Sequence, residues 1–271
     1  MRKNKLRKLL REGRPSIGTR MMNFWPGVIE IIGHTGAIDY VEFVSEYAPY
    51  DLFVLENMAR ASELFDMSTM IKVDQSVQTY VAQRALGSGI QNVLFTDIRT
   101  AQDARECVRI VRCETPQTGG INPCAMRRNV GYVLESGSKA FVEAMDEAVV
   151  ALMIEKKSAV VDLKEILSVE GLDMVQFGPG DYAMSIGIPG EKTHPDIRNA
   201  ERIVISTALQ KGIVPRAEVD SVDKALEYMD MGVRHFSIGN DMRILYNWYK
   251  QNGESLKEEL RKMEKIASTI K

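Results

Sequence analysis

The chain has 271 residues, a net charge of −2 at pH 7 and 45% hydrophobic residues, as in an ordinary globular protein. The near-zero charge argues against a nucleic-acid partner, and no apolar run approaches the roughly 20 residues that span a membrane. Three cysteines are too few to staple a secreted chain of this size, so we expect reduced thiols and a cytoplasmic protein. The length allows two domains or one α/β barrel.

The N-terminal segment MRKNKLRKLLREGRPS is basic, but it has no apolar core and no small-residue cleavage site. It is therefore not read as a targeting peptide. Leu6, Leu9 and Leu10 have helical spacing, and Gly13 supplies a stop. We expect a short amphipathic helix that packs on the fold, in preference to an arm that binds nucleic acid.

Short apolar runs alternate with helical patterns along the rest of the chain. The predicted strands are residues 16–20, 39–44, 69–73, 92–96, 149–154, 174–177, 213–216 and 235–238. The clearest helical patterns are residues 77–86, 101–111, 163–168, 195–211 and 222–231. Residues 114–131 form a long loop without a clear period, which is often functional on a compact barrel.

Eight β/α units in this length predict a closed barrel of the TIM (β/α)8 type. The main competitor is a doubly wound open sheet, which would normally carry a Gly-rich phosphate loop after its first strand. The first predicted strand instead ends in Thr-Arg-Met-Met, with no GxGxxG motif. We therefore expect one α/β domain over residues 1–271, a TIM barrel with an N-terminal helix and a C-terminal helical extension.

The tail over residues 241–271 is predicted to form one or two helices with an apolar stripe. The stripe consists of Trp248, Tyr249, Leu256, Leu260, Met263 and Ile266. It would pack either on the chain's own barrel or on a partner subunit. The stripe is long for a final helix, and this favours oligomerisation.

In a β/α barrel, chemistry gathers at the C-terminal ends of the strands. Charged and polar residues stand at these ends: Arg20, Ser45–Tyr47, Lys72, Asp74, Asp97, Glu155–Lys157, Gly178–Asp181, Arg216, Glu218 and Gly239–Asp241. Such a set suits a metal-dependent enzyme of small anionic substrates.

The strongest pair in this set is Glu155 and Asp181, which follow two strongly apolar runs. Two carboxylates on adjacent strands can share one hard divalent cation, which polarises a carbonyl. The Gly-Pro-Gly turn lets the backbone N–H groups of Gly180 and Asp181 face a carboxylate at a helix start. In the structural alternative, Glu155 pairs with a lysine and Asp181 is an N-cap.

The segment VALMIEKKSAVVDLKEILSVEGLDMVQFGPGDYAMSIGIPG resembles the core of the HpcH/HpaI aldolases, which are class II pyruvate-dependent enzymes related to 2-dehydro-3-deoxyglucarate aldolase. The matching elements are Met153–Glu155, Val169–Asp173 and Gly178–Ala183. LREGRPSIGTRM, TDIRTAQDARECVRIVR and GVRHFSIGNDMRIL extend the resemblance over nearly the whole chain.

This resemblance implies a metal-dependent carbon–carbon lyase that acts through a pyruvate-type enolate on a 2-keto acid, with an aldehyde as the second partner. It implies that Glu155 and Asp181 hold the cation, which would be magnesium, manganese or cobalt. It also implies a homo-oligomer, a hexamer or trimer, with swapped C-terminal helices.

The chain departs from the family pattern after its second strand. Tyr47 stands where the family has a histidine acid/base, and Val44 replaces the acidic residue that orients it, while Glu46 is retained. A tyrosine pKa near 10 makes a poor base but allows a hydrogen-bond donor. Glu46 or Glu42 would then replace the lost base, since burial raises a carboxyl pKa. Alternatively, Glu42 forms a buried salt bridge with Lys72 or Arg216.

Lys72 is the nearest match to the family arginine that grips the keto acid, although the alignment leaves Val73 open; lysine keeps the charge but loses the bidentate fork. The predicted catalytic residues are therefore Tyr47, Glu46 and Lys72. The predicted substrate-binding residues are Arg20, Gly180, Asp181, Arg216 and Glu218.

Two other functions stay open at this point. Without the histidine, the same site would favour decarboxylation of an oxaloacetate-like acid or a specialised condensation. A catalytically silent, oligomeric binding protein is the other alternative, although it need not keep Glu155, Asp181 and the Gly-Pro-Gly turn.

Overall fold

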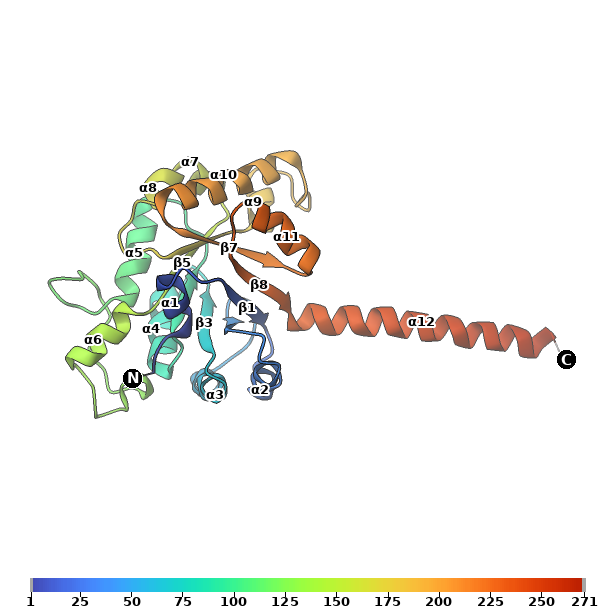
Figure 1. The fold of residues 1–271 in the computed structure, drawn as a ribbon, viewed down its shortest axis with the longest axis horizontal. Helices are drawn as coiled ribbons and strands as arrows, with labels where there is room; N and C mark the ends of the chain where they lie inside the picture. Colours follow the sequence, from blue (N-terminus) through green and yellow to red (C-terminus); the bar gives the residue numbers. More distant parts are fainter. Residues whose placement is uncertain (1, 270–271) are drawn as a thin grey trace.

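The computed structural model describes residues 2–269, with side chains through residue 265, so the side chain of Ile266 lies outside the described residues. Within this range, parallel strands close into a barrel in chain order, and helices surround it (Figure 1). The strands are β1 (Ser16–Met21), β2 (Tyr40–Val44), β3 (Ser68–Val73), β4 (Asn92–Phe95), β5 (Val150–Ile154), β6 (Met174–Phe177), β7 (Val214–Val219) and β8 (His235–Asn240). The predicted TIM barrel is confirmed.

Strand β7 is longer than predicted. The apolar pattern ends at Arg216, whereas the strand continues to Val219. Both Arg216 and Glu218 pair in register with β8, so they belong to the strand, and they interrupt the apolar pattern because their charged side chains line the cavity. Their place in a strand follows from ion pairs described below rather than from apolar burial.

The helices follow the expected β/α alternation, with differences in detail. They are α1 (Lys5–Arg11), α2 (Gly27–His34), α3 (Leu52–Glu63), α4 (Gln78–Ser88), α5 (Ala101–Val111), η1 (Arg128–Val130), α6 (Lys139–Asp146), α7 (Lys157–Val161), α8 (Leu163–Ile166), α9 (Pro179–Ser185), α10 (Pro195–Lys211), α11 (Val222–Asp230) and α12 (Asp241–Thr269). The helix predicted over 163–168 is the short α8, which ends two residues early, and a further short helix that was not predicted, α7, precedes it. Gly89 and Gly212 end α4 and α10 in the left-handed conformation, as glycine permits.

Helix α1 closes one end of the barrel, as its leucine spacing predicts. Leu6 is fully buried in a cluster with Tyr40, Met70 and Leu94. The side chain of Asn4 caps the helix and also donates a hydrogen bond to Asn92 Oδ1 at 2.7 Å. This end is therefore sealed, which leaves the opposite end, where the strands finish, for a site.

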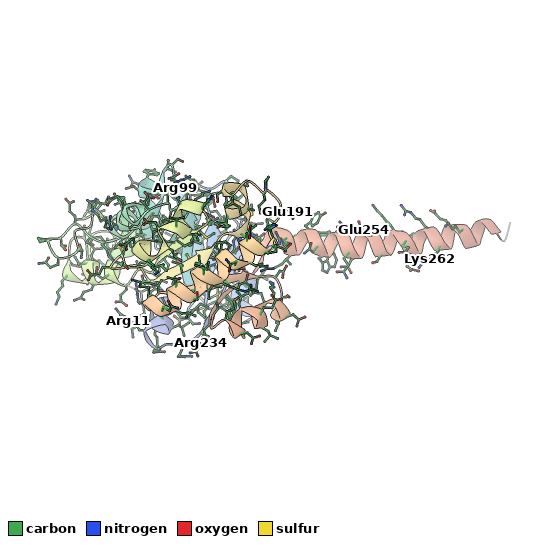
Figure 2. The ribbon with its side chains drawn as sticks, turned by 90° about the horizontal axis from the view of Figure 1, so that it is seen from above. Arg11, Arg99, Glu191, Arg234, Glu254 and Lys262 are labelled. Atoms are coloured by element: carbon green, nitrogen blue, oxygen red, sulfur yellow. The ribbon has the colours of Figure 1, made fainter. Side chains whose placement is uncertain are left out.

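Helix α12 projects away from the barrel (Figure 1). Glu254 and Lys262 mark its length beyond the body of the molecule in Figure 2. The predicted stripe residues Trp248, Tyr249, Leu256, Leu260 and Met263 are all exposed, so they do not pack on the chain's own barrel. No helix in the described range combines the length and apolar character that a membrane crossing needs.

His235, at the start of β8, gives a testable pH dependence of stability. Its ring contacts Ser16 Oγ at 2.9 Å, and burial, followed by the nearby charge of Arg234, lowers its pKa to about 4. An unfolded histidine titrates near 6.5, so the unfolded chain binds more protons as the pH falls below that value. We expect the free energy of unfolding to fall by about 2 kcal/mol between pH 7.5 and 5 through this residue. Denaturant titrations of the wild type and His235→Asn measure it, and equal pH slopes would contradict it.

Candidate active site

One cavity of about 560 Å³ lies at the C-terminal ends of the strands. It gathers most of the predicted site residues: Arg20, Tyr47, Lys72, Glu155, Gly180, Asp181, Arg216 and Glu218. A larger cavity of about 1240 Å³ lies beside α1 and the segment 128–147. Several of its charged groups pair with one another, among them Arg128 with Glu63 and Arg11 with Glu147. The chemistry therefore belongs to the smaller cavity.

Glu155 follows β5 directly and is nearly buried. Its Oε1 accepts a hydrogen bond from the backbone N–H of Asp97 at 2.8 Å. Burial raises the pKa of Glu155, and the nearby charge of Asp181 adds to this effect against the opposing Asp97 N–H and Lys72. A carboxylate with this raised pKa gains from a cation that neutralises it.

Gly178 makes room for the Glu155 carboxylate. A Cβ atom at position 178 would lie 2.6 Å from Glu155 Oε2 and 2.7 Å from Glu155 Cβ, closer than real Cβ contacts allow. Gly178 also precedes α9, whose first turn carries Asp181. The first glycine of the Gly-Pro-Gly turn, Gly178, is therefore required because Glu155 lies close to the start of α9.

The donor set fits a hard divalent cation. Glu155 and Asp181 offer carboxylate oxygens, which magnesium and manganese prefer. Among the described residues, no group of three or more His, Cys, Asp and Glu side chains is arranged to hold a metal. A cation held by two carboxylates keeps its other positions for water and for substrate oxygens, as magnesium sites commonly do.

The structural alternative for this pair does not hold. Gly178, rather than Asp181, is the N-cap of α9. Among the described side chains, a lysine forms an ion pair with Asp181 and not with Glu155: Lys156 Nζ lies 3.5 Å from Asp181 Oδ1. Lys156 makes a shorter ion pair, 2.6 Å, with Asp97 Oδ1.

Lys72 and Tyr47 line the cavity and form a second group with Glu46, which contacts Lys72 but does not line the cavity itself. Lys72 Nζ lies 2.5 Å from Glu46 Oε2, donates a hydrogen bond to Tyr47 Oη at 3.4 Å and stands 4.9 Å from the centre of the Tyr47 ring. Burial would lower the pKa of Lys72, but the hydrogen bond and charge of Glu46 outweigh it and raise the pKa. Burial raises the pKa of Tyr47. Lys72 is thus a fixed cation and Tyr47 a neutral phenol.

Lys72 and Val73 point to opposite sides of the barrel wall. Val73 is fully buried in the main hydrophobic cluster, which includes residues of the surrounding helices. Lys72 lines the cavity, as the alternation along a strand requires. Of the two residues, Lys72 is therefore the one that can face a substrate in the cavity.

A buried ion-pair network forms one wall of the cavity. Arg216 pairs with Glu42, Arg20 Nε lies 3.4 Å from Glu42 Oε1, and Arg20 also pairs with Glu218. Burial would raise the pKa of Glu42, but Arg216 and Arg20 outweigh it and lower the pKa. The expected use of Glu42 as a base with a raised pKa is therefore wrong, and its salt-bridge alternative, with Arg216, is confirmed.

Asp97 and Lys156 stand among the charged residues at the strand ends, but the sequence assigns neither a catalytic, substrate-binding or metal-binding role; each lies two residues after its strand. Asp97 adopts a positive φ of 58°, which turns its N–H toward Glu155. The arginines of the long loop are engaged elsewhere: Arg127 donates to the Gln83 carbonyl at 2.7 Å, and Arg128 pairs with Glu63. Within this chain, neither lines the cavity at the strand ends.

Comparison with known proteins gives consistent matches. The family model HpcH/HpaI aldolase/citrate lyase matches residues 26–247. The chain is similar to a hydroxypyruvate/pyruvate aldolase of Roseobacter denitrificans, with 28% identity over 90% of this chain and 93% of that protein. It is also similar to a 4-hydroxy-2-oxo-heptane-1,7-dioate aldolase of Escherichia coli, with 26% identity over 89% of this chain and 90% of that protein.

A solved structure supports the fold. A HpcH/HpaI aldolase/citrate lyase family protein from Burkholderia cenocepacia J2315 superposes with a TM-score of 0.85 and 24% identity. The match covers 94% of this chain and 100% of that one. The barrel and its helices are thus shared along almost the full length.

Proposed function

Since the chain belongs to the HpcH/HpaI aldolase/citrate lyase family, we propose that it is a divalent-metal-dependent carbon–carbon lyase that acts on a 2-keto acid through a pyruvate-type enolate. The observation that carries this proposal is the meeting of Glu155, Asp181 and the cationic Lys72 in one cavity. The aldolase names of its relatives support the same reaction class. The second product or substrate would be an aldehyde.

Glu155 and Asp181 are the residues that would hold the cation, with magnesium, manganese and cobalt as the candidates. When bound, the cation supplies Lewis-acid stabilisation of the negative charge that develops on the keto oxygen. The backbone N–H groups of Gly180 and Asp181 face the substrate carboxylate at the start of α9. Glu155 is held in place for this task by the Asp97 N–H and by the space at Gly178.

The remaining residues bind the substrate and manage the proton of the aldol hydroxyl. Lys72 places a permanent positive charge beside the keto acid. Tyr47 donates a hydrogen bond to the aldehyde oxygen, since its raised pKa keeps the phenol protonated. Glu46 contacts Lys72 and accepts the proton in cleavage. Arg20 and Glu218 bound the side of the cavity where the aldehyde partner would lie, and Arg216 supports them through Glu42.

Decarboxylation of an oxaloacetate-like acid is the second candidate. The neutral Tyr47 favours it, because loss of CO2 reaches the same enolate without a base that removes a proton. The metal ligands and Lys72 would serve both reactions equally. Release of CO2 measured against release of aldehyde separates the two.

Exchange of the methyl protons of pyruvate tests the enolate itself. We expect pyruvate to gain deuterium at its methyl group when it is incubated in deuterated water with the enzyme and Mg²⁺, Mn²⁺ or Co²⁺. Mass spectrometry measures the deuterium gained. Chelation should stop the exchange, and renewed metal should restore it. Absence of enzyme-dependent exchange with all three metals would contradict the aldolase proposal, and CO2 release from oxaloacetate in the same sample would favour the second candidate.

We also propose a cytoplasmic homo-oligomer, a hexamer or a trimer, in which the whole chain is one barrel domain. The exposed apolar side chains of α12 support the oligomer, since burying them needs a second surface. Cys107, Cys113 and Cys124 are free thiols, which supports a reducing compartment. Sedimentation of the full chain measures the oligomeric state.

A further inference from the structure

Lys156 stands at an unusual place for a lysine. It is the N-cap residue of α7, a position that normally carries a hydrogen-bond acceptor, and its side chain makes no cap bond. The ammonium group turns instead toward the cavity end of the barrel, where it contacts Asp97 Oδ1 at 2.6 Å and Asp181 Oδ1 at 3.5 Å. A residue that breaks a local rule at a site often does so for function.

The contacts of Lys156 join the two carboxylates that would hold the metal. Glu155 Oε1 accepts from the Asp97 N–H, the Asp97 carboxylate binds Lys156, and Lys156 reaches the Asp181 carboxylate. Without a cation, Lys156 thus supplies positive charge beside a cluster of three carboxylates. The side chain of Lys156 is mostly buried, with 18% exposed, so this charge is only partly screened by solvent.

A divalent cation at Asp181 would compete with this ammonium. Both need the same carboxylate, and two positive charges a few ångströms apart repel by one or more kcal/mol even at the dielectric constant of water. The shorter contact to Asp97 gives Lys156 a second partner to which it can withdraw. Asp97 is itself fixed, because its backbone N–H is bound to Glu155.

We propose that Lys156 is an internal competitor of the metal: it neutralises Asp181 in the metal-free enzyme and withdraws to Asp97 when the cation binds. This role rests on the proposed metal site at Glu155 and Asp181. Lys156 is a positioning residue in this scheme, since it acts through Asp181 and Asp97 rather than on the substrate. Its consequence is a metal affinity lower than the two carboxylates alone would give.

Titration of the full-length protein with Mn²⁺ by calorimetry tests the proposal. We expect Lys156→Met to lower the dissociation constant about tenfold, because it removes the competing charge. Without metal, the variant should unfold at a lower temperature than the wild type, because Asp97 and Asp181 lose their partner. Added Mn²⁺ should raise the unfolding temperature of the variant by more than that of the wild type. Lys156→Arg keeps the charge and should bind Mn²⁺ like the wild type.

Lys157→Met is the matched control, since Lys157 is the next residue and its side chain is exposed; its affinity should not change. An unchanged or weaker affinity of Lys156→Met for Mn²⁺ would overturn the role of Lys156. If Glu155→Gln nevertheless fails to bind Mn²⁺, the proposed metal site at Glu155 and Asp181 remains supported. If the wild type itself binds no Mn²⁺ at millimolar concentration, the metal site and the role of Lys156 both fall.

Discussion

Replacing Glu155 with glutamine is expected to abolish Mn²⁺ binding and to lower kcat/KM for the lyase reaction by about a thousandfold or more. Glutamine has nearly the same shape and its amide oxygen can still accept from the Asp97 N–H. It lacks the negative charge, however, and a neutral amide is a weaker ligand for a hard cation than a carboxylate. A thousandfold loss corresponds to about 4 kcal/mol of transition-state stabilisation, which is the scale of a metal's electrostatic effect.

Calorimetric Mn²⁺ titration and steady-state kinetics measure the two effects of Glu155→Gln. Thermal unfolding without metal should be unchanged or slightly raised, because the variant removes a buried charge whose pKa is raised. Gly178→Ala provides a steric counterpart: its Cβ would displace the Glu155 carboxylate without changing any charge. It should weaken Mn²⁺ binding as well. Wild-type Mn²⁺ affinity in Glu155→Gln would show that the cation binds elsewhere.

The barrel was predictable because it depends on periodicity alone. Apolar runs such as residues 149–154 are buried on both faces in β5, so they are recognised without knowledge of their neighbours. Strand β7 shows the limit of apolar periodicity as a signal, because the charged residues Arg216 and Glu218 interrupt the pattern in the second half of the strand. Arg216 is fully buried and pairs with Glu42 from β2, while the more exposed Glu218 pairs with Arg20 from β1, and no local pattern reveals either partner.

The candidate site was predictable as far as strand ends determine it. Parallel strands bring their C-terminal residues to one end, and this places Glu155, Asp181 and Lys72 at one cavity. Pairing among side chains was not predictable in the same way. The sign of the Glu42 pKa shift depends on two arginines on other strands, and the link from Glu155 to Asp97 depends on one positive φ. Both are properties of the folded barrel rather than of a sequence window.

Replacing Arg216 with methionine is expected to destabilise the fold by about 3–5 kcal/mol. Arg216 and Glu42 are both fully buried and pair with each other, and the guanidinium also lies over the Tyr40 ring at 5.4 Å. Methionine fills much of the same space, so the main effect is a buried Glu42 carboxylate left with Arg20 at 3.4 Å. Denaturant unfolding monitored by circular dichroism measures the change.

The double variant Glu42→Gln with Arg216→Met distinguishes lost charge pairing from lost packing. If the unpaired carboxylate causes the destabilisation, removing its charge should restore a large part of the stability lost in Arg216→Met, since a buried ion pair contributes little net stability over neutral groups. Arg202→Met, on an exposed position of α10, should change stability by no more than about 0.5 kcal/mol. A double variant as unstable as the sum of both single variants would mean that packing around Tyr40 and Met70, rather than the ion pair, holds this wall of the cavity together.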